Sequence, residues 1–390
     1  MFRSQRSHRS YPRLISACLL AASLTILAAC GGGDAESDAP ATPEKQADLS
    51  MLTEGWNTIE PGAPTTCSDG SPFTFFVRPG NPDLVHFYLE GGGACWNGAT
   101  CDVTGRPTYS PVVNETDGQA ANGVFAFDRD DNPLQDYTTV FVPYCSGDVH
   151  LGDRSTEYTA TSEEGERTFT IEHRGLANAR AAMAWLEDHL GSPGAIFVSG
   201  SSAGSIPSPV YASWLAEAWP EARITSLGDG AGGYRGASEQ PPYLSWGTQE
   251  ALGWERLTEL GDQLSFEDLY VAAAARQPRV RYATFDTAED SVQLDFLRLA
   301  NQASDSLLTL LDANHDEIAT ANPEFRRYVA GGELHTILGR PELYTYRVGE
   351  QKFVDWLTDL VEGRDPGSVR CGDCTVAELV EDAAAAQATE

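Results

Sequence analysis

The segment AIFVSGSSAGSIPSPV, residues 195–210, constrains the fold of this chain more than any other stretch. Its apolar and β-branched start is typical of a buried strand, and the pattern VYASWLAEAW that follows is helical. The glycines between them permit a tight turn with close backbone approach. The segment therefore predicts a strand, a sharp turn and a helix, which together form one unit of an α/β fold.

The alternation of strands and helices continues along the chain. Short apolar runs predict strands at 84–92, 138–145, 222–230 and 279–286, and residues 176–190 have the spacing of an amphipathic helix. Strands separated by helices need crossover connections, which produce a mostly parallel sheet with its ligand chemistry at the carboxyl ends of the strands. We therefore expect an α/β fold with a mostly parallel central sheet flanked by helices.

The first 29 residues have the pattern of an export signal. The basic segment RSQRSHRSYPR precedes LISACLLAASLTILAA, an apolar run that is short for a membrane-spanning helix. The run ends in LAAC followed by Gly31, which resembles the bacterial lipobox, so Cys30 is expected to carry a lipid and to supply the chain's only contact with a membrane. A generic cleaved signal is the alternative.

The signal sets the predicted domain organisation and location. Residues 30–54 are rich in Gly, Ala, Pro and acidic residues, which predicts a flexible acidic linker. Residues 55–375 contain no linker or repeat and are expected to form a single domain, followed by a tail at 376–390. We expect an exported protein, either an outer-membrane lipoprotein, a periplasmic or cell-surface protein, or a secreted one.

The net charge excludes one class of partner. The whole chain has a formal charge of −31, and removal of the signal, which contains four arginines and no acidic residue, makes it −35. A chain this acidic would be repelled by phosphate backbones, so we expect no nucleic-acid partner. The sequence carries no signal for a particular oligomeric state.

Six cysteines remain when Cys18 in the signal and Cys30 are set aside. In an exported protein they predict up to three disulfides, with short spacings favouring local pairs. The expected pairs are Cys95 with Cys101, Cys371 with Cys374, and, as the remaining pair, Cys67 with Cys145. A zinc site at the C-terminal CGDC would need two further ligands nearby, so no metal and no cofactor is expected.

The turn GSSAG at 200–204 matches the pattern G-x-S-x-G, whose central residue is Ser202. A serine on such a turn projects its Oγ, and the following helix directs backbone amides to the same point. Acyl transfer also needs donors for the oxyanion, and LEGGGACW at 89–96 is placed to supply them after an earlier strand. We expect the amides of Gly92, Gly93 and Ala203 to form this oxyanion hole.

The histidine partner follows by elimination, because α/β-hydrolases have the order serine, acid, histidine. Only His315 and His335 follow Ser202. His315 lies in LDANHDEIA, which reads as a polar surface turn and fails as a calcium loop because Glu317 replaces the required glycine. His335 follows FRRYVAGGEL, an apparent last strand with its glycine turn, so we predict His335 as the base.

The sequence constrains the catalytic acid and the substrate pocket less than it constrains the serine and the histidine. FDTAEDSVQ offers both Asp286 and Asp290, which spacing alone does not separate. The expected pocket residues follow strand ends and the glycine loop. They are Trp96, Asp148, His150 and Asp229.

Together these motifs resemble the pectin acetylesterase family, which includes sugar deacetylases and Notum carboxylesterases. The matching stretches are LEGGGACW, PYCSGDVHLGD, SGSSAGS, SLGDGAGGY, DSVQ and GELHTIL, which span 67 to about 345. The resemblance implies an α/β-hydrolase-like serine esterase of bacterial type that acts on O-acyl esters without metal. It selects Asp290 from the DSVQ motif, with Asp286 as the fallback, and it supports the Cys95 to Cys101 pair.

The acceptor pocket is not carried over by this resemblance, because other members place an aromatic residue before the cysteine where this chain has Ala94. Charge also argues against pectin, a polyanion that a strongly acidic enzyme repels within a Debye length of about 8 Å. We expect an acetylated neutral glycan or a small acyl ester as substrate. A lipid or polyester carboxylesterase and a non-catalytic glycan-binding surface lipoprotein are the alternatives.

Overall fold

The fold was analysed in a computed structural model of the chain. It describes residues 46–114, 117, 120–163, 165–235, 242–302 and 304–382. The predicted export signal, Cys30 and most of the predicted linker lie outside these residues, as does the end of the tail. None of the helices in the described ranges has the length and apolar character needed to cross a membrane.

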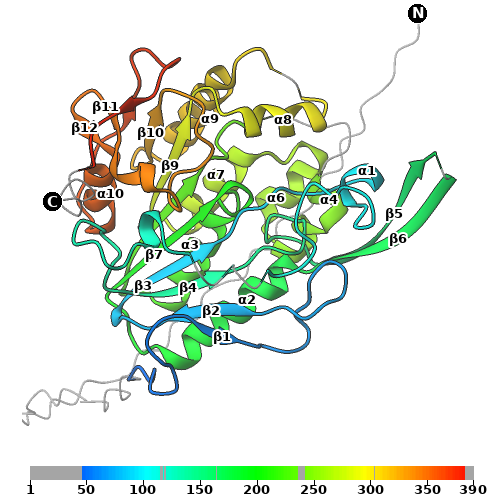
Figure 1. The fold of residues 1–390 in the computed structure, drawn as a ribbon, viewed down its shortest axis with the longest axis horizontal. Coiled ribbons are helices and arrows are strands. Elements are labelled where there is room, and N and C mark those ends of the chain that lie inside the picture. Colours follow the sequence, from blue (N-terminus) through cyan, green and yellow to red (C-terminus); the bar gives the residue numbers. More distant parts are fainter. Residues whose placement is uncertain are drawn as a thin grey trace, which may run out of the picture. The chain divides into compact units, whose positions relative to one another are not determined.

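Nine strands form the central sheet, in the order β1-β2-β4-β3-β7-β8-β9-β10-β13 (Figure 1). They are β1 (Asn57–Ile59), β2 (Phe75–Arg78), β3 (Asn81–Leu89), β4 (Tyr137–Val142), β7 (Ala195–Ser201), β8 (Arg223–Asp229), β9 (Arg281–Thr287), β10 (Arg326–Ala330) and β13 (Val369–Arg370). Strands β1 and β2 pair antiparallel at one edge, and every pair from β4 to β13 is parallel. The predicted mostly parallel α/β sheet is confirmed, although β10, the predicted last strand, is followed in this sheet by β13.

Side chains alternate between two cores on the faces of this sheet. In β7, Ile196 and Val198 join one core and Phe197 joins the other, as expected for consecutive strand residues. The first core is covered by α2 (Gly175–His189), α3 (Ser208–Ala218) and α7 (Phe266–Arg276), and the second by α10 (Phe353–Val361). Burial on both faces explains why these strands read as continuous apolar runs.

Two smaller sheets accompany the main one. Strands β5 (Arg154–Ser162) and β6 (Gly165–His173) form a hairpin that extends away from the central sheet in Figure 1. Strands β11 (Tyr346–Val348), β12 (Gln351–Lys352) and β14 (Glu378–Leu379) form the other. The hairpin was not predicted, because its strands are rich in Thr, Glu and Arg and most of their side chains are exposed.

The remaining helices lie in the connections between strands. They are α1 (Gly98–Cys101), α4 (Pro242–Trp246), α5 (Thr248–Leu252), α6 (Glu255–Leu260), α8 (Ser291–Leu299) and α9 (Leu307–Ala321). Parallel strands end at one common edge, so the loops after β3, β7, β8, β9 and β10 converge there. These loops carry the candidate catalytic residues.

Candidate active site

Ser202 lies on a sharp turn directly after β7, as the first residue of the 3-10 turn η3 (Ser202–Gly204). Its φ of 54° is in the left-handed region, which residues other than glycine rarely adopt. The neighbouring glycines are needed for this turn, because a Cβ at Gly204 would overlap the carbonyl of Leu89 and one at Gly200 would overlap the carbonyl of Gly204. The strained turn presents Ser202 at the strand end.

His335 bridges Ser202 and a carboxylate from another strand end. Its Nε2 lies 2.8 Å from the Oγ of Ser202, and its Nδ1 lies 2.7 Å from Oδ2 of Asp290. The His335 side chain is 17% exposed, whereas Asp290 is fully buried. A serine, an imidazole and a carboxylate in this contact order have the geometry of a nucleophile, a base and the group that orients the base.

Asp290 is held by the first turn of α8, for which it is the N-cap. Its Oδ1 accepts hydrogen bonds from the backbone N–H groups of Val292, at 2.9 Å, and Gln293, at 3.1 Å. Its Oδ2, which faces His335, also accepts a hydrogen bond from Nε2 of Gln293 at 3.0 Å. These three donors fix the orientation of the carboxylate toward the imidazole.

Asp286, the fallback acid, faces a different histidine. Its Oδ1 accepts hydrogen bonds from the Gly232 N–H at 2.8 Å and from Gln293 Nε2 at 3.2 Å, and its Oδ2 lies 3.3 Å from Nε2 of His315. The predicted exposure of His315 was wrong, because LDANHDEIA is part of helix α9 and His315 lies on its inward face, fully buried. Only Asp290 of the two candidate acids contacts His335.

The glycine loop after β3 packs directly on the serine turn. A Cβ at Gly91 would lie 2.8 Å from the Cβ of Ser202, so this approach requires glycine. Gly92 and Gly93 have φ values of 148° and 84°, in the region that favours glycine. Gly93 and Ala203 line a cavity together with Ser202, whereas Gly92 is outside its lining.

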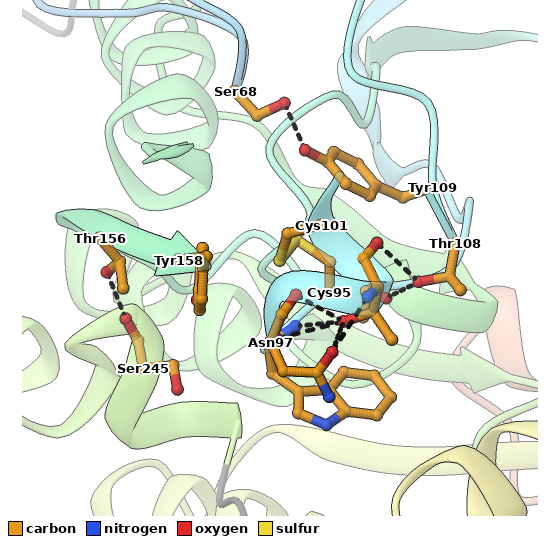
Figure 2. The surroundings of a disulfide bond; sticks show 12 residues. Ser68, Cys95, Asn97, Cys101, Thr108, Tyr109, Thr156, Tyr158 and Ser245 are labelled. Atoms are coloured by element: carbon orange, nitrogen blue, oxygen red, sulfur yellow. Dashed lines mark hydrogen bonds between the residues drawn. A yellow bond between two sulfur atoms is a disulfide. The ribbon is translucent and has the colours of Figure 1, made fainter. Parts of the chain in front are cut away.

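A disulfide fixes the segment that follows these glycines. Cys95 and Cys101 are joined, and Asn97 between them caps α1 by accepting hydrogen bonds from the N–H groups of Ala99 and Thr100, both at 3.0 Å (Figure 2). The Thr108 hydroxyl donates to the carbonyl of Ala94 (Figure 2). The loop is therefore tied on both sides of Trp96, which forms part of the cavity wall.

The cavity beside Ser202 has a volume of about 100 Å³. Its wall is mostly apolar and combines the glycine loop, the serine turn, α4, α7 and α8. The larger apolar side chains that line it are Trp96, Val149, Ile206, Tyr243, Trp246, Leu264, Phe266 and Phe296. An ester whose carbonyl lies at Ser202 could place its acyl group against this wall, away from water.

Three of the four predicted pocket residues do not line this cavity. Trp96 does, but Asp148, His150 and Asp229 are each at most 1% exposed and lie behind the loops. Burial raises the pKa of the Asp148 and Asp229 carboxyls to about 6 and lowers the pKa of the His150 imidazole to about 4. The sequence places a residue at a strand end but does not tell which way its side chain points.

Disulfides join all six cysteines of the described residues. The pairs are Cys67–Cys145, Cys95–Cys101 and Cys371–Cys374. In the described ranges, the group of side chains close enough to hold a metal ion is Cys95, Cys101 and His173. Two of its three atoms are the sulfurs of one disulfide, which cannot act as thiolate ligands.

Glu90, which sequence reasoning missed, lies between β3 and the glycines and accepts a hydrogen bond from the Tyr144 N–H at 3.0 Å. Burial, with Asp117 nearby, raises the pKa of its carboxyl from 4.5 to about 8. The folded protein thus holds this proton to higher pH than the unfolded chain. The resulting stabilisation is complete below about pH 4.5 and is lost as the pH rises through about 8.

Glu90→Gln is expected to flatten the dependence of stability on pH between about pH 7 and 8.5, where the Asp148 and Asp229 carboxyls, with pKa values of about 6, are largely ionised. The release of one proton changes the free energy of unfolding by at most about 1.4 kcal/mol per pH unit. The free energy of unfolding of wild type should therefore fall by up to this amount per pH unit, while that of the variant should stay constant. Denaturant unfolding at several pH values measures the free energy of unfolding of both proteins. An equal slope in both proteins would contradict the role of Glu90.

The fold and the contacts at Ser202 are those of the α/β-hydrolase class. Within it, residues 54–239, just under half of the chain, match the family model described as Pectinacetylesterase. The matched segment contains the glycine loop and the serine turn but ends before Asp290 and His335. This match supports a carboxylic ester hydrolase that acts on acyl esters.

Curated relatives are Notum proteins. The chain is 29% identical to palmitoleoyl-protein carboxylesterase NOTUM of Schmidtea mediterranea, over 26% of this chain and 20% of that protein. It is 28% identical to the Homo sapiens protein of that name, over 36% of this chain and 27% of that protein. It is 32% identical to the inactive palmitoleoyl-protein carboxylesterase notum1b of Danio rerio, over 22% of this chain and 66% of that protein. The match thus spans about a fifth to a quarter of the length of the first two relatives.

Proposed function

We propose that this protein is an exported serine esterase that hydrolyses O-acyl esters, with O-acetyl groups on a carbohydrate as its substrate. The observation that carries the proposal is the contact of His335 with both Ser202 and Asp290, at 2.8 and 2.7 Å, beside an apolar cavity. A protein that only bound glycans would have no physical need for this arrangement on a strained turn.

In the proposed reaction, Ser202 Oγ attacks the ester carbonyl carbon while its proton passes to Nε2 of His335. Asp290 orients the imidazole and stabilises its positive charge. The amides of Gly92, Gly93 and Ala203 are proposed to bind the oxyanion. When the carbon–oxygen bond to the alcohol breaks, His335 returns the proton to the leaving oxygen. Water, deprotonated by His335, then attacks the acyl-enzyme and releases the acid and free Ser202.

The proposed substrate class is supported by the net charge of the chain and by the cavity beside Ser202. The net charge of −31 disfavours a polyanionic acceptor and is compatible with a neutral acetylated glycan. A second candidate, a lipid or polyester carboxylesterase, is favoured by the apolar wall, which includes Trp246, Phe266 and Phe296. The name of the Notum relatives, palmitoleoyl-protein carboxylesterase, also favours an acyl chain longer than acetyl.

Export is proposed from residues 1–29, with attachment through a lipid on Cys30. The three disulfides support an oxidising compartment outside the cytoplasm. Residues 30–54 are proposed to act as a flexible linker to one domain at 55–375, followed by the tail at 376–390.

A series of p-nitrophenyl esters from acetate to palmitate, followed by acetylated neutral glycans, tests the substrate. We expect kcat/KM to be highest for acetate, with acetate released from the glycans. Ala300→Phe, which adds a ring at the cavity wall, should then affect octanoate more than acetate. Faster hydrolysis of chains longer than octanoate than of acetate would instead establish the second candidate.

A further inference from the structure

Asp229 occupies the end of β8 and is fully buried, yet it faces two loops of the site. Its Oδ2 accepts a hydrogen bond from the Ser201 hydroxyl at 2.7 Å, and Ser201 directly precedes the nucleophile candidate. The same carboxylate accepts hydrogen bonds from the N–H groups of Ile337 and Leu338, at 3.0 Å each. Asp229 therefore joins the serine turn to the loop that carries His335.

The backbone between His335 and these bonded amides is strained. Thr336 has a φ of 63°, in the left-handed region, where a β-branched residue is a strong outlier. Such a conformation persists only where the surroundings enforce it. Asp229 supplies that enforcement, because its hydrogen bonds hold the two residues immediately after Thr336.

Gly230, the residue after Asp229, adds a steric contact to the same point. Its φ is 77°, and a Cβ there would lie 2.9 Å from Cγ2 of Thr336 and 3.2 Å from its N. Any outward movement of the turn at Asp229 would therefore displace Thr336. The end of β8 and the His335 loop form one tightly packed unit.

We propose that Asp229 is a positioning residue that holds the His335 loop in its strained conformation and so aims Nε2 of His335 at Ser202. This inference rests on the proposed function, since it explains how His335 is kept aligned with Ser202. Asp229 touches no reacting atom, because its carboxylate accepts from the Ser201 hydroxyl and from the N–H groups of Ile337 and Leu338, none of which takes part in the reaction. Its hydrogen bonds to amides on one side and to Ser201 on the other fix the distance between base and nucleophile.

Asp229→Asn keeps the size of the side chain but places an NH₂ group against donors that need an acceptor. We expect kcat to fall about 10²-fold, the usual effect of misplacing a catalytic group by about 1 Å, with little change in KM. Thr336→Gly removes the strain and should leave kcat nearly unchanged. In the Asp229→Asn background Thr336→Gly should restore kcat about tenfold, since the loop can then reach the left-handed conformation without enforcement.

Leu186→Ala is the control for loss of stability alone. Leu186 is fully buried on α2, so its variant should melt at lower temperature with wild-type kcat. Wild-type kcat in Asp229→Asn, or no recovery in the double variant, would overturn the inference.

A second measurement separates this inference from the proposed function. The low-field NMR signal of the His335 Nδ1–H, bonded to Asp290, reports loop alignment without any substrate. We expect Asp229→Asn to weaken or shift it, Thr336→Gly to restore it in the double variant, and Leu186→Ala to leave it in place. If wild type hydrolyses no ester but this pattern holds, the proposed function fails and the positioning role stands. An unaltered signal in Asp229→Asn overturns the positioning role whatever the activity.

Discussion

Ser202→Ala is expected to lower kcat for p-nitrophenyl acetate by about 10⁴-fold or more, because the variant cannot form the acyl-enzyme. The expected residual rate comes from the cavity and the oxyanion donors alone. The fold should be retained, since glycine packing and not the Ser202 hydroxyl shapes the turn. Steady-state kinetics and covalent labelling by a fluorophosphonate probe measure the effect, with labelling expected in wild type and absent in the variant.

Ser205→Ala is the matched control for Ser202→Ala. Ser205 lies on the same turn and is buried, and its Oγ has no hydrogen-bond partner among the described residues. Its variant should be labelled like wild type. Labelling that survives in Ser202→Ala, or a wild type that is never labelled, would contradict the esterase proposal. The second outcome would favour the non-catalytic glycan-binding alternative, and one Notum relative is described as inactive.

Asp290→Asn is expected to lower kcat about 10⁴-fold, as loss of the carboxylate that orients a catalytic imidazole typically does. Asparagine is also a good N-cap, so α8 and the fold should survive the change. The effect should therefore appear in kcat and in the pH dependence of kcat/KM far more than in the melting temperature.

Asp286→Asn is the matched control, because both carboxylates are fully buried and both accept a hydrogen bond from Gln293. Asp286 lies beside His315, so its loss should reduce stability while kcat stays within about tenfold of wild type. Full activity of Asp290→Asn together with inactivation of Asp286→Asn would assign the acid role to Asp286.

Several features could be predicted from local pattern alone. The turn GSSAG between a buried strand and a helix identified Ser202, and the chain order of α/β-hydrolases left two histidines to choose from. The parallel sheet followed from alternating strands and helices, and the structure has it. These inferences depend on residues that are neighbours in the sequence, and hydrophobic periodicity and the residue types found in turns are reliable guides to their local structure.

Other features depended on which direction a side chain takes. His315 looked polar and exposed in sequence, but the helical period turns it inward against Asp286. Asp148, His150 and Asp229 follow strand ends as predicted, yet they point beneath the loops and not into the cavity. A residue at a strand end has two faces available, and only packing selects one.

The sequence by itself determined the α/β architecture, the turn that carries Ser202, and the candidate set of Asp286, Asp290, His315 and His335. It did so because periodicity, glycine placement and the alternation of strands with helices along the chain are local properties. Only the tertiary structure shows that Asp290, which the family resemblance had selected over Asp286, contacts His335, and that Asp229 joins the two loops. These relations join residues 28 to 109 positions apart in sequence, and they exist only once the strand ends have met at one edge of the sheet.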